Sequence, residues 1–113
     1  MNIGNVTFDC DDALALSAFW SKVVDRPVAE GASADFAVIV GRPNPNLLFI
    51  KVPEAKAAKN RCHVDLDADA DLDDVRRRLE GFGATFVHRK DEFGISWMTF
   101  ADPEGNEFCV GEG

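Results

Sequence analysis

The chain has 113 residues, of which 46% are hydrophobic and 28% are charged. This length suits one domain of ordinary size rather than several, and the composition excludes wholesale disorder. Lysine and arginine total 12 against 20 acidic residues, and the resulting net charge of −8 disfavours nucleic acid as a partner. The first residues lack the pattern of a signal peptide and no apolar run is long enough to cross a bilayer, so we expect a cytoplasmic protein with no membrane partner.

The three cysteines, Cys10, Cys62 and Cys109, form no closely spaced pair. An odd number without a short spacing predicts neither a disulfide framework nor a zinc knuckle. We therefore expect three reduced thiols.

The first half of the chain predicts a strand, a helix and then two or three strands. Residues 6–10 alternate between apolar and polar, which is typical of a half-buried strand. Asp11 and Asp12 are candidate N-caps for a helix with one apolar stripe, which must end before Pro27. The remaining strands are expected at residues 36–40 and 47–52, with a short one at 28–30.

The second half predicts the same order of elements. Residues 62–67 alternate again, with Cys62, Val64 and Leu66 on the covered side. Asp71 is a candidate cap for a helix that ends among glycines near residue 82. The last three strands are expected at residues 84–89, 95–101 and 107–110.

The two halves align with a slowly drifting offset. Residues 6–9 fall on residues 64–67 at an offset of 58, and residues 46–50 fall on residues 106–110 at an offset of 60. Because the order of the elements is kept, we interpret the chain as a duplicated module within a single domain. Module one spans about residues 1–56 and module two about residues 57–113.

Three segments together resemble the glyoxalase-like branch of the vicinal oxygen chelate superfamily. They are Asp9-Cys10-Asp11 before the first helix, His63-Val64-Asp65-Leu66, and the D-P-E-G-N-E-F-C segment of residues 102–109, which is the most specific. The resemblance covers nearly the whole chain. It implies an α+β fold of two βαβββ modules in one domain, with a curled mixed sheet around a cavity and the helices outside. It also implies a homodimer.

The resemblance further implies where a metal ion would be held. In metal-dependent members, the first and last strands of each module each supply one ligand, and the matching positions are Asn5, Phe49, His63 and Cys109. Only His63 is a usual ligand of such a site, since Phe49 cannot coordinate and Asn5 is a poor substitute. We therefore expect no bound metal and no other cofactor. The alternative is a zinc or copper site made by His63 and Cys109, completed by Asp65 or water.

The candidate ligand-binding residues combine the four positions that the resemblance implies with neighbours that strand parity places on the same face, and with Trp97. They are Asn5, Thr7, Asp9, Phe49, His63, Asp65, Trp97, Glu107 and Cys109. Glu107 is placed at the rim, and Trp97 is either a flat wall for a ligand or a core residue. Because residues 47–50 are all apolar, alternation does not fix the register of the strand that contains Phe49.

These residues support several functions. The leading interpretation is a metal-free, glyoxalase-like protein that binds a small organic molecule, and that sequesters a cationic or aromatic metabolite or antibiotic as bleomycin resistance proteins do. The alternative is a lyase, isomerase or dioxygenase that uses His63, the best catalytic candidate, in an atypical metal site or as an acid or base. A regulatory module is a third class. A nucleophilic pair of Cys109 and His63 is a further alternative, for which the sequence names no third, orienting group.

Overall fold

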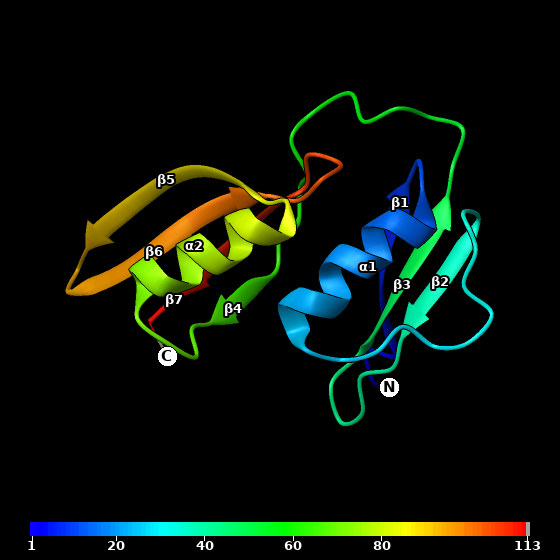
Figure 1. Cartoon of the computed structure of the whole chain (residues 1–113), viewed down its shortest axis with the longest axis horizontal. Helices are drawn as coiled ribbons and strands as arrows, with labels where there is room; N and C mark the ends of the chain where they lie inside the picture. Colours follow the sequence, from blue (N-terminus) through cyan, green and yellow to red (C-terminus); the bar gives the residue numbers. More distant parts are fainter. Residues whose placement is uncertain (113) are drawn as a thin grey trace. The chain divides into compact units, whose positions relative to one another are not determined.

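The computed structural model describes residues 1–112, which form two compact units that divide between Lys56 and Ala57. Each unit combines one helix with one mixed sheet, and the helix packs on one face of the sheet of its own unit (Figure 1). The fold therefore belongs to the α+β class that the sequence predicts. Neither helix has the length and apolar character that a membrane-spanning helix requires.

Unit 1 contains one helix and three strands in the predicted order. The elements are β1 (Asn5–Cys10), α1 (Ala13–Val24), β2 (Phe36–Ile39) and β3 (Asn46–Lys51). The central strand is β3, which is parallel to β1 and antiparallel to β2. The short strand predicted at residues 28–30 is reduced to a single bridge between Val28 and Ile39. Helix α1 begins where predicted, because the side chain of Asp12 accepts hydrogen bonds from the first turn.

The register of β3 corrects the predicted orientation of Phe49. Phe8 lies directly opposite Phe49, and their rings stack with centroids 5.2 Å apart. Phe8 also packs against Trp20 of α1, and Phe49 is 0% exposed. The prediction that Phe49 faces a ligand is therefore wrong, because its ring belongs to the core beneath the helix. Leu48 takes the opposite face, where it pairs with Thr7.

Unit 2 repeats the strand order with one more complete strand. The elements are β4 (Asp65–Asp67), α2 (Leu72–Phe82), β5 (Thr85–Glu92), β6 (Ile95–Ala101) and β7 (Glu107–Gly111). The sheet has the order β4-β7-β6-β5, with β4 parallel to β7 and the other pairs antiparallel. Cys62 lies before β4 begins and is exposed, so the prediction that it is covered is wrong.

The core of unit 2 lies between α2 and one face of its sheet. Leu72, Val75 and Leu79 are the buried residues of the helix, and Asp71 caps its first turn as predicted. Phe100 stacks on Phe108 with ring centroids 5.7 Å apart, and both rings are 0% exposed. This packing fixes which side chains of β6 and β7 point to the opposite face.

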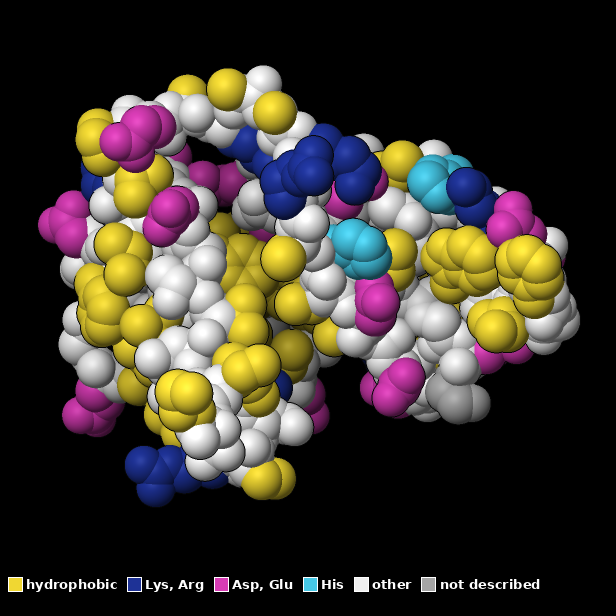
Figure 2. Space-filling model, turned by 180° about the vertical axis from the view of Figure 1, so that it is seen from behind, with side chains coloured by type: hydrophobic (Ala, Val, Ile, Leu, Met, Phe, Trp, Pro, Cys, Tyr) yellow, Lys and Arg dark blue, Asp and Glu magenta, His cyan; other side chains and the backbone are white. Residues whose placement is uncertain are grey.

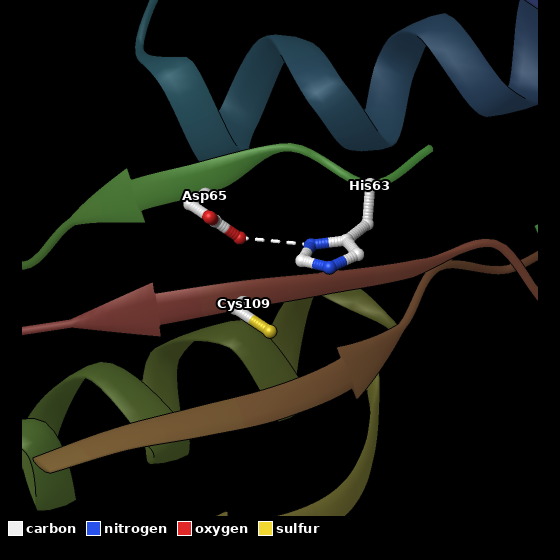
Figure 3. A group of neighbouring side chains, drawn as sticks. All are labelled: His63, Asp65 and Cys109. Atoms are coloured by element: carbon white, nitrogen blue, oxygen red, sulfur yellow. Dashed lines mark hydrogen bonds and ion pairs between the residues drawn. The ribbon is translucent and has the colours of Figure 1, made fainter. Parts of the chain in front are cut away.

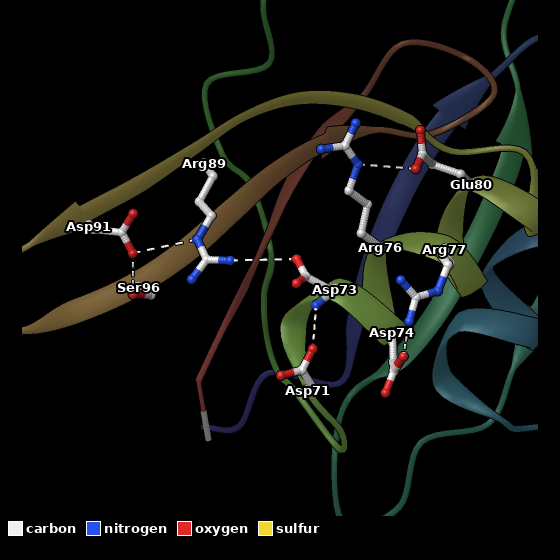
Figure 4. A network of polar contacts seen from close by, with 9 residues as sticks. All are labelled: Asp71, Asp73, Asp74, Arg76, Arg77, Glu80, Arg89, Asp91 and Ser96. Carbon is white, nitrogen blue, oxygen red and sulfur yellow. Dashed lines mark hydrogen bonds and ion pairs between the residues drawn. The ribbon is translucent and has the colours of Figure 1, made fainter.

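The outer surface of α2 is covered by ion pairs (Figure 4). Arg76 pairs with Glu80 and Arg77 with Asp74 along the helix, while Arg89 of β5 reaches Asp73. These side chains are largely exposed, so each pair contributes little to stability. Arg77 and Arg78 therefore belong to a solvated face, whereas Arg76 is half-buried over the ring of Phe86.

Candidate functional site

The outer face of the unit 2 sheet carries a line of polar side chains across all four strands. Asp65 of β4 lies opposite Cys109 of β7. Cys109 in turn lies opposite Thr99 of β6. Thr99 lies opposite His88 of β5. Directly paired residues point to the same face of a sheet. We call these four residues, Asp65, Cys109, Thr99 and His88, the polar row.

His63 joins one end of the polar row. It precedes β4 by two residues, and its Nδ1 lies 2.8 Å from Oδ1 of Asp65 (Figure 3). One ligand atom each from His63, Asp65 and Cys109 lies within 4.8 Å of the others, and the three side chains point toward one another. The structure therefore brings together three of the predicted site residues.

The other half of the polar row is held by a buried hydroxyl. Thr99 is 5% exposed, and its Oγ1 lies 3.3 Å from Sγ of Cys109 and 3.4 Å from Nε2 of His88. A threonine hydroxyl both donates and accepts, so it can bond to the thiol and the imidazole together. The sulfur of Cys109 consequently lies between a hydroxyl and the pair formed by His63 and Asp65.

His88 and Thr99 are the site residues that the sequence reasoning missed. Simple alternation places His88 on the same face as Phe86, whose ring packs against Phe100 in the core. A register shift between Phe86 and His88 instead turns His88 to the outer face. A bulge of this kind redirects the side chains that follow it. No signal in the sequence marks its position.

Trp97 provides an apolar surface on the same face. It lies two residues from Thr99 on β6, opposite Gly111 of β7, and is half-buried. Further along the β5–β6 hairpin, Ile95 and Phe93 are 56% and 95% exposed. Figure 2 shows the chain's two imidazoles on one face, with hydrophobic side chains gathered toward the end of this hairpin. The structure thus places Trp97 where a ligand on the polar row can reach it.

Glu107 lies on this face near the turn, as predicted. It is half-buried, and its backbone is held at both ends by Asn60, whose Oδ1 accepts from the amide and whose Nδ2 donates to the carbonyl. Asn60 therefore extends the pairing of β7 beyond the end of β4. The carboxylate of Glu107 adds negative charge to the edge of the site.

The predicted site residues of unit 1 lie on the exposed face of β1. Asn5, Thr7 and Asp9 alternate with half-buried or buried residues, and Oδ1 of Asn5 accepts a hydrogen bond from Nδ2 of Asn46 at 3.1 Å. Of the nine candidates, these three share one face of unit 1, five share one face of unit 2, and Phe49 lies in the core.

The donor atoms do not form the metal site that the resemblance describes. Thr7 pairs with Leu48 in unit 1, and Asp65 pairs with Cys109 in the same way in unit 2. Leu48 is therefore the structural counterpart of Cys109. A leucine side chain cannot coordinate a metal. In unit 2, one oxygen of Asp65 bonds to Nδ1 of His63, which leaves Nε2 of His63, Sγ of Cys109 and the other oxygen of Asp65 as donors. Catalytic zinc sites use about three protein ligands. Unit 2 thus groups one imidazole, one thiol and one carboxylate, which is a different set from the four positions that the resemblance describes.

Comparison with known proteins places the chain in a family. The glyoxalase-like domain family matches residues 5–111, and the chain therefore belongs to it. No curated protein sequence matches the chain.

Several solved structures share the fold. A glyoxalase/bleomycin resistance protein/dioxygenase family enzyme from Burkholderia phytofirmans PsJN has a TM-score of 0.78 and 19% identity, over 99% of this chain and 98% of that one. A possible glyoxalase from Bacillus cereus has a TM-score of 0.75 and 20% identity, over 98% of both chains. Lactoylglutathione lyase from Agrobacterium tumefaciens has a TM-score of 0.69 and 22% identity, over 99% of this chain and 93% of that one. At these identities the likeness establishes the fold.

Proposed function

We propose that this protein binds a small aromatic or cationic organic molecule on the outer face of the unit 2 sheet. The observation that supports this proposal is the position of Trp97 on the same face as His63, Asp65 and Cys109. Small-molecule sites combine apolar, often aromatic, walls with a few polar groups that fix orientation. Sequestration of such a molecule is the role that we propose.

The charge of this face favours a cation. Asp65, Asp67 and Glu107 share it with the half-buried Trp97, and the whole chain carries a net charge of −8. Carboxylates raise the local concentration of a cationic ligand. A cation over an indole ring gains about 0.5 to 2 kcal/mol more. A planar cation therefore satisfies both the aromatic and the acidic parts of the face.

We also propose that binding requires no metal ion. The positions of Leu48 and Phe49 support this proposal, because the structural counterpart of Cys109 is a leucine and Phe49 is buried in the core, and neither side chain coordinates a metal. Metal analysis of the purified protein, before and after dialysis against a chelator, provides the test. Stoichiometric zinc that is lost from the H63A variant contradicts a metal-free site.

Thermal unfolding against a ligand panel tests the binding proposal. Planar aromatic amidines and guanidines should raise the melting temperature more than their neutral amide analogues do. The shift should disappear in W97A and shrink in E107Q. F36A removes an aromatic ring that is 45% exposed in unit 1 and should leave the shift unchanged. A panel that produces no shift, or a shift that survives in W97A, contradicts the proposal.

A second function, acid–base catalysis by His63, is favoured by the hydrogen bond that Asp65 accepts from this imidazole. A carboxylate on one ring nitrogen fixes the orientation of the imidazole. In that case H63Q should retain binding of an active compound and lose its chemical conversion. Equal conversion by wild type and H63Q excludes this role.

A further inference from the structure

We infer that Cys109 is a reactive nucleophile, that His63 accepts its proton, and that Asp65 is the positioning residue that orients His63. This inference deepens the proposed function because it concerns the same face, but its test needs no ligand of that site. The separate experiments therefore distinguish failure of the inference from failure of the binding proposal.

The hydrogen bond between Asp65 and His63 determines which ring nitrogen acts as the base. A carboxylate only accepts, so Nδ1 carries the proton that is shared with Oδ1 of Asp65 at 2.8 Å. The neutral imidazole then has its lone pair on Nε2. This nitrogen is the proton acceptor that a neighbouring thiol needs.

The thiol of Cys109 lies within reach of that base. A ring nitrogen of His63 and Sγ of Cys109 lie no more than 4.8 Å apart, and the His63 side chain is 42% exposed. Catalytic hydrogen bonds are often long before a substrate binds. Proton transfer therefore requires the thiol and the imidazole to approach each other while Nδ1 keeps its hydrogen bond to Asp65.

A second neighbour stabilises the sulfur once it is charged. Oγ1 of Thr99 lies 3.3 Å from Sγ of Cys109, and Thr99 is 5% exposed, so the hydroxyl is held in place by the sheet. A hydroxyl that donates to a thiolate stabilises the charged form. Cys109 is half-buried, which leaves the sulfur partly open to small molecules.

The reaction class that fits this arrangement is conjugate addition to an α,β-unsaturated carbonyl compound. The thiol proton passes to Nε2 of His63, and the sulfur lone pair forms a bond to the β-carbon of the acceptor. The π electrons of the carbon–carbon double bond move to the α-carbon and carbonyl, and His63 returns the proton to the α-carbon. Nothing leaves and nothing is oxidised, so atoms and electrons balance. Trp97 offers a planar surface on which such a conjugated acceptor can lie.

The three cysteines allow an internal comparison within one protein. Acrylamide is the probe, because it reacts by addition and increases the peptide mass by one whole acrylamide. The protein is treated at neutral pH with a chelator present, and peptide mass spectrometry follows Cys109, the exposed Cys62 and the buried Cys10 over time. If exposure alone determined the rate of reaction with acrylamide, Cys62 should react first, because it is the most exposed of the three cysteines. An activated Cys109 should instead react about tenfold faster than Cys62 or more.

Substitutions then separate activation from simple accessibility. H63Q should lower the rate at Cys109 about tenfold or more, and D65N should lower it by a smaller factor, while both leave Cys62 unchanged. In D65N the imidazole nitrogen-15 shifts of His63 should also show a loss of the preference for a proton on Nδ1, which a structural role for Asp65 would not produce. Continued protection of Cys10 shows that each variant remains folded.

Two results overturn the inference. The first is a rate at Cys109 that does not exceed the rate at Cys62. The second is a fast rate at Cys109 that H63Q leaves unchanged, which would assign the reactivity to exposure or to Thr99 alone.

Discussion

The carboxylate of Asp102 holds Asn106 through three hydrogen bonds, one from the backbone amide and two from the side-chain amide. The same carboxylate accepts from the amide of Glu104, and Asp102 is 3% exposed. The most specific part of the family resemblance, D-P-E-G-N, is therefore a turn that joins β6 to β7. Its residues stabilise the fold and position Glu107 and Cys109 at the start of β7.

Removal of this carboxylate should strongly destabilise unit 2. D102A removes the acceptor of the amides of Glu104 and Asn106 in a partly buried turn, at a cost of about 2 to 4 kcal/mol. D102N keeps one acceptor oxygen and should lower the free energy of unfolding by less than D102A does. Chemical denaturation measures both variants, with the exposed E54A as the control. A D102A variant as stable as E54A shows that the turn does not depend on this side chain.

The corrected position of Phe49 predicts the effect of truncating it. F49A opens a cavity beneath α1 and should lower the free energy of unfolding by about 3 to 5 kcal/mol. L48A removes a half-buried side chain from the other face of the same strand and should cost less than about 2 kcal/mol. Equal losses measured by urea denaturation contradict the observed register of β3.

Gly41 should tolerate no side chain. A Cβ at this position would overlap the backbone oxygens of Asn44 and Pro45, which are not free to move aside. G41A should therefore destabilise the protein by about 2 kcal/mol or more. Gly4 has open space around its Cα, so G4A is the matched control and should change the melting temperature little. A G41A variant with the same melting temperature as G4A contradicts this close approach of the backbone.

The hydroxyl of Ser96 should control the titration of Asp91. Ser96 donates a hydrogen bond to this carboxylate and lowers its pKa below the ordinary value of 3.8, with a smaller contribution from Arg89. A lowered pKa means that the stabilising effect is present above the pKa of the unfolded chain and is lost as pH falls through the folded value. S96A should raise the pKa of Asp91 in an NMR titration.

Asp69 provides the control for that titration within the same molecule. Arg78 lowers the pKa of Asp69 through a separate hydrogen bond, which S96A does not touch. The pKa of Asp69 should therefore stay constant while that of Asp91 rises. A joint rise of both values indicates a change in the fold rather than the loss of one hydroxyl.

The sequence predicted the elements that depend on local chemistry. Asp12 and Asp71 cap the helices where expected, because a carboxylate before an apolar stripe is a strong local signal. Parity also placed Asp65 and Cys109 correctly, since the strands that contain them alternate clearly. His63 was predicted from the family resemblance, and its partner Asp65 was not recognised as the orienting group.

The remaining site residues depended on register, which the sequence does not state. The offset of 60 paired Phe49 with Cys109, whereas the structure pairs their strands at an offset of 61, with Leu48 as the counterpart. A shift of one residue turns every side chain to the other face. The all-apolar run at residues 47–50 could not reveal the shift, because either face could hold such residues.

The register shift in β5 sends the side chains of Phe86 and His88 to opposite faces of the sheet. Before the register shift, Phe86 packs against Phe100 and lies beneath Arg76 of α2. After the shift, His88 belongs to the polar row on the outer face. The next residue, Arg89, points to the helix side, where it reaches Asp73. If Val87 paired with Thr99 in a regular ladder instead, strict alternation would turn the imidazole inward and the guanidinium away from the helix. The one unpaired residue of this strand therefore decides whether an imidazole or a guanidinium reaches the outer face.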